Sequence, residues 1–143
     1  MDFQAYNKIL ICNTAMRNVC AGGAAIGYEF AIKYPSYRGA FLSCIEELRF
    51  WIDGKAIDKA DITFILNNKQ FLIDELPECY KEYWFVREAA TIRVMNHGLL
   101  ASGSHTVRVY MKHRVPYTGY FGEYLVLDSD VTETLPAEEG LAG

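Results

Sequence analysis

Long apolar runs are missing from this sequence. A helix that crosses a bilayer needs about 18 consecutive, largely apolar residues, and no run approaches that length. Residues 1–5 also lack the basic stretch and the following apolar stretch of a secretion signal. These absences predict a soluble, cytoplasmic protein with no membrane partner.

An excess of basic charge is missing too. The chain has 14 Lys and Arg against 18 Asp and Glu, which gives a net charge of -4. Nucleic acids and anionic membranes attract clustered positive charge, so neither is expected as a partner. A chain of 143 residues is long enough to bury one core. We predict a single domain over residues 1–132 and a flexible, acidic C-terminal tail over residues 133–143.

Metal-site spacing is absent among the cysteines and histidines. The four cysteines, Cys12, Cys20, Cys44 and Cys79, form no Cys-x-x-Cys, and no histidine stands at zinc-site spacing from them. Without a secretion signal, reduced and mostly buried thiols are expected rather than disulfides. The sequence therefore predicts no metal or cofactor held by this chain.

Sustained helical spacing is also lacking, and alternation with a period of two takes its place. Apolar side chains alternate with their neighbours in segments that include residues 26–33, 47–52, 62–66, 91–95 and 106–112. Such segments predict strands with one buried face. About eight of them, separated by turns, favour an all-β antiparallel β-sandwich of jelly-roll or immunoglobulin-like type, with a small barrel as the alternative.

Turn residues punctuate these strands. Asn67-Asn68 predicts a hairpin between two strands, and Asp53-Gly54 and Gly22-Gly23 predict further tight turns. Helix is expected only as a short turn within residues 74–82.

The sequence offers few candidate catalytic residues. His97 lies in a predicted turn, and Ser104 and His105 are neighbours whose side chains point to opposite faces of a strand. They therefore cannot form a nucleophile and base pair. His113 lies on the apolar face of its strand. An enzyme that uses His105 or His113 with a carboxylate stays open as one hypothesis.

Aromatic residues are the clear excess, at 14% of the chain. Alternation places Tyr28, Phe30, Phe50, Phe64 and Phe85 inward. Other aromatics fall in loops or on the face opposite the apolar residues, and exposed Trp, Tyr and Arg together are typical of interface anchors. We predict a partner interface or pocket rim formed by Tyr34, Tyr37, Arg38, Trp51, Trp84, Tyr117, Tyr120 and Phe121. A second small core beneath the loops is the alternative.

Several short stretches resemble a known family, the small or beta subunits of bacterial C-glycoside deglycosidases. None is a catalytic signature, so the resemblance depends on their order within roughly residues 1 to 116. The matching stretches are Tyr37-Arg38-Gly39, Leu42-Ser43-Cys44-Ile45-Glu46, Trp51-Ile52-Asp53-Gly54-Lys55, Ile62-Thr63-Phe64, Gly98-Leu99 and Gly103-Ser104-His105-Thr106-Val107. Residues 117–124 do not resemble any stretch of this family. Their aromatic content alone suggests a role in stacking on a sugar or flavonoid.

This resemblance implies a supporting chain in a hetero-oligomeric carbon–carbon lyase. In that family a larger TIM-barrel alpha subunit carries a divalent, manganese-like metal and the general base. The reaction cleaves the C–C bond between a 3-keto-glucosyl unit and a flavonoid-type aglycone. A stand-alone carbohydrate-binding module is the competing hypothesis, in which the same aromatics form a sugar platform.

Overall fold

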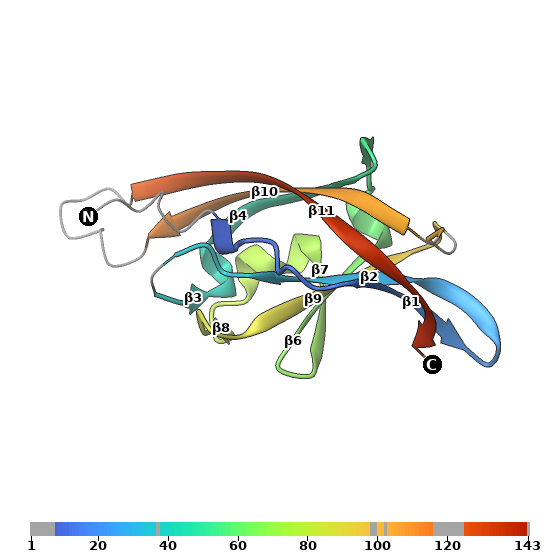
Figure 1. Cartoon of the computed structure of the whole chain (residues 1–143). Coiled ribbons are helices and arrows are strands. Elements are labelled where there is room, and N and C mark those ends of the chain that lie inside the picture. The colour runs from blue at the N-terminus through green and yellow to red at the C-terminus, as the bar shows by residue number, and fades with distance from the viewer. Residues whose placement is uncertain (1–7, 37, 98–99, 102, 116–124, 143) are drawn as a thin grey trace.

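The computed structural model describes residues 8–36, 38–97, 100–101, 103–115 and 125–142. These residues confirm an all-β fold (Figure 1). The strands are β1 (Met16–Ala21), β2 (Ala24–Lys33), β3 (Ala40–Phe41), β4 (Ile45–Ile52), β5 (Lys55–Ala56), β6 (Ile62–Leu66), β7 (Lys69–Leu72), β8 (Tyr83–Trp84), β9 (Ala89–Met95), β10 (Gly103–Val115) and β11 (Leu125–Ala142). Short 3-10 helices include η2 (Leu42–Cys44), η3 (Lys59–Asp61) and η4 (Ile73–Glu78).

One large sheet holds most of the strands, in the order β5-β4-β10-β11-β1-β2-β9-β6-β7. Its neighbours pair antiparallel except β1 and β11, which pair in parallel. The sheet folds back on itself, because Phe30 of β2 and Phe50 of β4 lie four strands apart in this order yet have ring centroids 5.8 Å apart. The two layers thus belong to one curled sheet, rather than to the two separate sheets expected of a sandwich (Figure 1).

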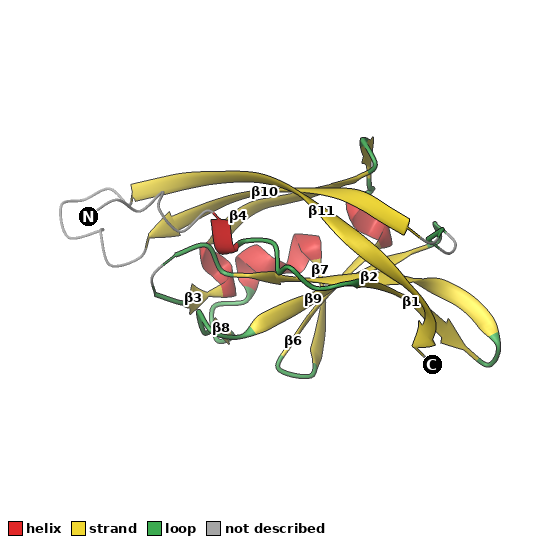
Figure 2. Cartoon of the chain, viewed as in Figure 1, coloured by secondary structure: helices red, strands yellow, loops and turns green. Residues whose placement is uncertain are grey.

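The 3-10 segments lie where the curled sheet is open. Figure 2 shows them as short helices between the two layers. Segment η4 contacts β4 on one layer and both β6 and β7 on the other. The short helical turn predicted near residues 74–82 is found as η4. The expectation that helix occurs only there is wrong, because η2 and η3 lie elsewhere in the chain. None of the helices in the described residues is long and apolar enough to cross a bilayer.

The predicted turns are correct. Asn67 and Asn68 join β6 and β7 with φ values of 54° and 62°, and Asp53 and Gly54 join β4 and β5 with φ values of 51° and 82°. Two consecutive positive φ values define the type I′ turn, whose twist matches that of the flanking strands. Gly22-Gly23 connects β1 and β2 in the same way.

The C-terminal tail is a correction. Residues 133–142 continue β11, which pairs with β10 up to Ala137 and then with β1, instead of forming a flexible extension. Leu135 is only 1% exposed and belongs to the core. The sequence hid this strand because Ser129 and Glu133 interrupt the apolar alternation of Leu127, Val131 and Leu135.

The core assignments are correct with one exception. Tyr28, Phe30, Phe50 and Phe64 are buried, whereas Phe85 is 56% exposed. Strand β8 ends before Phe85, so the alternation that placed Phe85 inward does not extend to it. All four cysteines are free thiols, as expected, with Cys44 buried and the other three half-buried.

Candidate functional site

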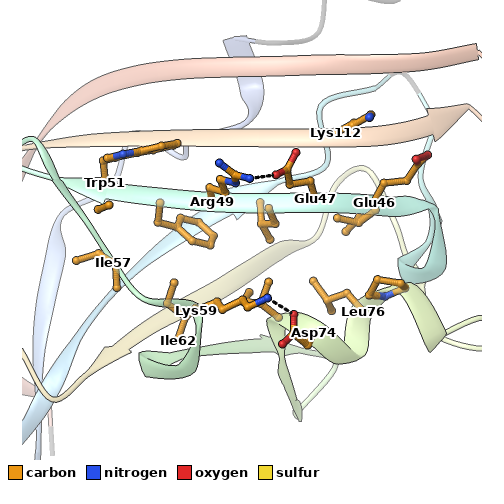
Figure 3. Close-up of a pocket in the computed structure, with 16 residues that line it drawn as sticks. Glu46, Glu47, Arg49, Trp51, Ile57, Lys59, Ile62, Asp74, Leu76 and Lys112 are labelled. Atoms are coloured by element: carbon orange, nitrogen blue, oxygen red, sulfur yellow. Dashed lines mark ion pairs between the residues drawn. The ribbon is translucent and has the colours of Figure 1, made fainter.

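A groove of about 760 Å³ runs along the outer edge of β4. Strand β4 forms one wall, and η3 and η4 form the other (Figure 3). Apolar side chains from both walls line it, namely Ile45, Leu48, Phe50, Ile57, Ile62, Ile73 and Leu76. Each of these side chains also belongs to the core, so the groove exposes the edge of the core where the sheet does not close.

Two ion pairs lie on opposite walls of this groove. Lys59 Nζ lies 2.8 Å from Asp74 Oδ1 on one wall, and Arg49 pairs with Glu47 on the β4 wall (Figure 3). The Asp74 carboxylate bonds Lys59 and raises the pKa of its ammonium group. These side chains are largely exposed, and such pairs contribute little net stability. The rim of the groove is therefore charged, balanced in sign and easily rearranged.

Trp51 lies on the outer face of β4, as its alternation predicted, and is half-buried. The guanidinium of Arg108 from β10 sits 4.3 Å from the centre of the Trp51 ring. The same guanidinium donates two hydrogen bonds to Asp130 of β11, at 2.9 and 2.7 Å. This bidentate contact lowers the pKa of Asp130 and raises that of Arg108. Asp130 thus holds the Arg108 guanidinium in place, and the guanidinium in turn stabilises the position of the Trp51 ring beside the groove.

Trp84 and Tyr34 do not lie on an accessible surface, which corrects their prediction as interface or rim residues. They are 0% and 2% exposed, and their ring centroids are 5.4 Å apart. Trp84 also packs on Phe64 at 5.4 Å and donates from Nε1 to the carbonyl of Glu88 at 2.8 Å. Strand β8 pairs with β3 in a separate two-residue ribbon, whose core-facing side carries Trp84. These two residues belong to the main hydrophobic core, not to a second small core beneath the loops.

His113 lies in the same buried cluster. It is 0% exposed, its ring centroid is 5.1 Å from that of Tyr34, and its Nδ1 lies 3.0 Å from the Tyr34 hydroxyl. Burial lowers the pKa of His113 to about 4, which keeps the imidazole neutral near pH 7. Its Nε2 is also enclosed and has no hydrogen-bond partner among the described residues. The imidazole therefore has no access to a substrate from solution in this structure.

His105 serves as a structural tie. Its Nδ1 lies 2.6 Å from Asp53 Oδ2 and its Nε2 lies 2.7 Å from the Ala101 carbonyl. Two acceptors favour the doubly protonated ring, and these bonds raise the pKa of His105 and lower that of Asp53. His97 similarly bonds Asp61 at 3.1 Å. Both His105 nitrogens are occupied, so neither is available as a general base here.

An exposed aromatic cluster escaped the sequence analysis. Phe41, Tyr83 and Phe85 stack edge to face along β3 and β8, with centroids 5.1 and 4.7 Å apart. Phe41 is 43% and Phe85 is 56% exposed. The alternation of Tyr83, Trp84 and Phe85 was visible in the sequence. It was interpreted with Trp84 outward and Phe85 inward, whereas the structure has Trp84 buried and Phe85 exposed.

Glycine at position 39 is required by the approach of these two short strands. A Cβ atom there would lie 2.1 Å from the Trp84 carbonyl oxygen and 3.0 Å from the Tyr83 ring. No other residue fits this separation without moving the backbone. The Gly of the Tyr37-Arg38-Gly39 stretch thus fixes the position of the exposed aromatic cluster.

The remaining predicted site residues divide into two groups. Arg38 is exposed beside the ribbon of β3 and β8. Tyr37, Tyr117, Tyr120 and Phe121 lie outside the described residues. The structure thus leaves Trp51 and Arg38 as the accessible members of the predicted set within its described part.

Fold and surface together define a class of protein. Within the described ranges, no three His, Cys, Asp or Glu side chains cluster so as to hold a metal ion. What the described surface does offer is a groove at an open strand edge, a cation–aromatic row and an aromatic cluster. These are features of an all-β chain suited to contact with another molecule.

The chain belongs to the C-glycoside deglycosidase beta subunit family, whose sequence pattern matches residues 6–117. It is 33% identical over 102 residues to the C-glycoside deglycosidase beta subunit of Eubacterium cellulosolvens, covering 71% of this chain and 69% of that protein. It is 34% identical over 99 residues to the 3'-dehydrocarminate deglycosidase beta subunit of a Microbacterium species, covering 69% of this chain and 74% of that protein. A C-glycoside deglycosidase beta subunit of Arthrobacter globiformis is 29% identical over 86 residues. The chain is therefore a subunit of an enzyme complex in this family.

Proposed function

We propose that this chain is the supporting subunit of a lyase that cleaves the C–C bond of 3-keto C-glucosides with flavonoid-type aglycones. The observation that carries the proposal is the family match over residues 6–117. A relative named as a 3'-dehydrocarminate deglycosidase beta subunit supports an oxidised glycoside as the substrate class. Cleavage then proceeds by elimination, because the ketone acidifies the neighbouring C–H.

We assign the chemistry to a larger alpha subunit with a TIM-barrel fold, which supplies a divalent metal ion and the general base. The environments of the histidines support this division of labour. His113 is enclosed and His105 uses both ring nitrogens in structural bonds. This chain contributes stability and, through its groove and surface aromatics, an interface with the alpha subunit.

Activity measurements on the separate and mixed subunits test this function. We expect turnover of a 3-keto C-glucosyl flavonoid by a mixture of this chain and its alpha subunit, and none by this chain alone. The physical reason is that, among the described residues, His113 is enclosed and both ring nitrogens of His105 are already bonded. Product release measured by chromatography, with co-elution of the two subunits, provides the readout.

Two other results would contradict the proposal. Turnover by this chain alone that is lost in His105→Ala or His113→Ala would support a small enzyme. Saturable binding of glucose by this chain alone, with no co-elution and no turnover in the mixture, would support a carbohydrate-binding module.

Trp51 tests the interface role separately from folding. Trp51→Ala removes a half-buried ring and its contact with Arg108, so we expect unfolding free energy to fall by only about 1 kcal/mol. Affinity for the alpha subunit should fall about tenfold, as for an aromatic anchor at an interface. Urea unfolding and surface plasmon resonance measure the two effects. Tyr80→Ala, at a 67% exposed aromatic that does not line the groove, is the control and should leave both values unchanged.

A further inference from the structure

The outer edge of β4 is open over most of its length. Strand β5 covers only its end, where Trp51 pairs with Ala56 and Ile52 pairs with Lys55. One further bond runs from the Ile57 amide to the Phe50 carbonyl at 3.0 Å. In the described part of the chain, no strand pairs with the stretch from Ile45 to Arg49 on this side.

The direction of the free backbone groups follows from two hydrogen bonds. The Phe50 carbonyl accepts from Ile57, on the β5 side, and the Asp53 amide donates to the Thr106 carbonyl, on the β10 side. Backbone groups of successive strand residues point to opposite edges. Even-numbered residues of β4 therefore face the groove, and the N–H and C=O of Leu48 point into it. Glu46 departs from this rule because the register with β10 shifts there.

Leu48 is the residue of β4 whose backbone groups face the groove. The residue as a whole is only 4% exposed, and no bond from its backbone on the groove side is described. Backbone N–H and C=O groups at such positions are nearly always paired. The opposite end of the sheet differs, because the Leu72 amide at the end of β7 is already bonded by Glu75 Oε1 at 2.9 Å.

The groove also has room and a suitable lining for an added strand. Its volume of about 760 Å³ extends along the β4 edge, and its walls are apolar beneath and charged at the rim. An extended segment places alternate side chains on opposite faces. One set would pack on Ile57, Ile73 and neighbouring apolar residues, while the other would meet the exposed ion pairs of Arg49 and Lys59.

We infer that β4 takes up a short extended segment of the alpha subunit, which pairs with Leu48 and adds a strand to the sheet. The inference rests on the proposed function, since it takes the partner from the subunit family to which this chain belongs. Main-chain hydrogen bonds would supply affinity, and the apolar lining would select alternating apolar residues in the incoming segment. The exposed salt bridges at the rim can rearrange around it at little cost.

Asp74 provides a site at which to block the groove without disturbing the fold. It lines the groove at the start of η4, and its side chain is 72% exposed. Asp74→Trp should weaken alpha-subunit binding about tenfold or more, because the ring occupies space that the segment needs. Glu78→Trp makes the same change on an exposed residue of η4 that does not line the groove, and should bind normally. Asp74→Ala removes the charge without adding bulk, and should also bind normally.

Amide hydrogen exchange on the wild-type complex decides between strand addition and other contacts. Exchange at Leu48 should slow at least about tenfold when the alpha subunit binds, as expected of a newly formed ladder bond. Glu47 and Arg49, whose amides already face β10, should exchange slowly in both states and serve as internal controls.

The possible failures are distinguishable. A complex that forms with unchanged exchange at Leu48 would overturn the strand addition and leave the proposed function intact. The absence of any complex would overturn both. Protection of Leu48 that rises with the concentration of this chain alone would replace the alpha subunit by a second copy as the occupant.

Discussion

Replacing Trp84 by alanine is expected to lower the free energy of unfolding by about 3–5 kcal/mol. The side chain is completely buried, packs on Tyr34 and Phe64, and donates a hydrogen bond to the Glu88 carbonyl. Its removal leaves a cavity and an unpaired carbonyl, and both effects destabilise. Urea unfolding followed by far-ultraviolet circular dichroism measures the loss, which is a large share of the roughly 5–15 kcal/mol typical of a domain.

Phe85→Ala is the matched control for this prediction. Phe85 is the next residue and another aromatic, but it is 56% exposed. Its replacement should change the unfolding free energy by about 0.5–1 kcal/mol, since little area is lost from the core. Equal effects of the two substitutions, or a Trp84→Ala variant as stable as the wild type, would contradict the assignment of Trp84 to the core.

Acidification from pH 7 toward pH 4 is expected to remove about 3 kcal/mol of stability through His113 alone. Burial lowers the pKa of His113 from 6.5 to about 4 in the folded chain. The unfolded chain therefore binds a proton between these two values while the folded chain does not. This contribution is complete above pH 6.5 and is lost progressively as the pH falls to about 4. Urea unfolding at a series of pH values measures the slope.

Two substitutions isolate this effect from other titrating groups. His113→Gln keeps a hydrogen-bonding group beside Tyr34 but cannot titrate, so its acid-dependent loss should be smaller than that of the wild type. His105 acts in the opposite direction, because its raised pKa makes its stabilisation largest when it is protonated. His105→Gln should therefore increase the loss on acidification. The nearby Asp128 carboxylate only partly offsets the effect of burial on the pKa of His113. An unchanged slope in His113→Gln would exclude His113 as the source.

Much of the local structure was predictable because it depends on neighbouring residues. Alternation identified Phe30 and Phe50 as core residues. The Asn67-Asn68 and Asp53-Gly54 turns were predicted correctly because a tight hairpin turn requires positive φ values, which Asn, Asp and Gly adopt more readily than other residues. The family resemblance was recognised from short stretches of sequence such as Tyr37-Arg38-Gly39, and the family match over residues 6–117 confirms it. The order of these stretches along the chain indicates the family, although none of them is a catalytic motif.

The site was less predictable, since exposure depends on distant partners. Trp84 was predicted outward because it alternates with Tyr83 and Phe85, yet β8 pairs with β3 outside the main sheet and turns that face inward. Leu48 was recognisable as apolar and inward-facing. Nothing in the sequence around Leu48 indicates that, among the described residues, no strand would pair with its backbone on the groove side.

By itself the sequence determined the all-β class, the tight turns, most of the inward aromatics and the family, because alternation, backbone preference and motif order are local properties of the chain. Tertiary structure decided that most strands form one curled sheet and that residues 133–142 extend β11. It also decided that, within the described ranges, most of the β4 edge has no neighbouring strand beside the groove. Strand pairing joins residues far apart in sequence, such as Met16 with Ala137. Which edge remains unpaired therefore depends on how the whole sheet is assembled.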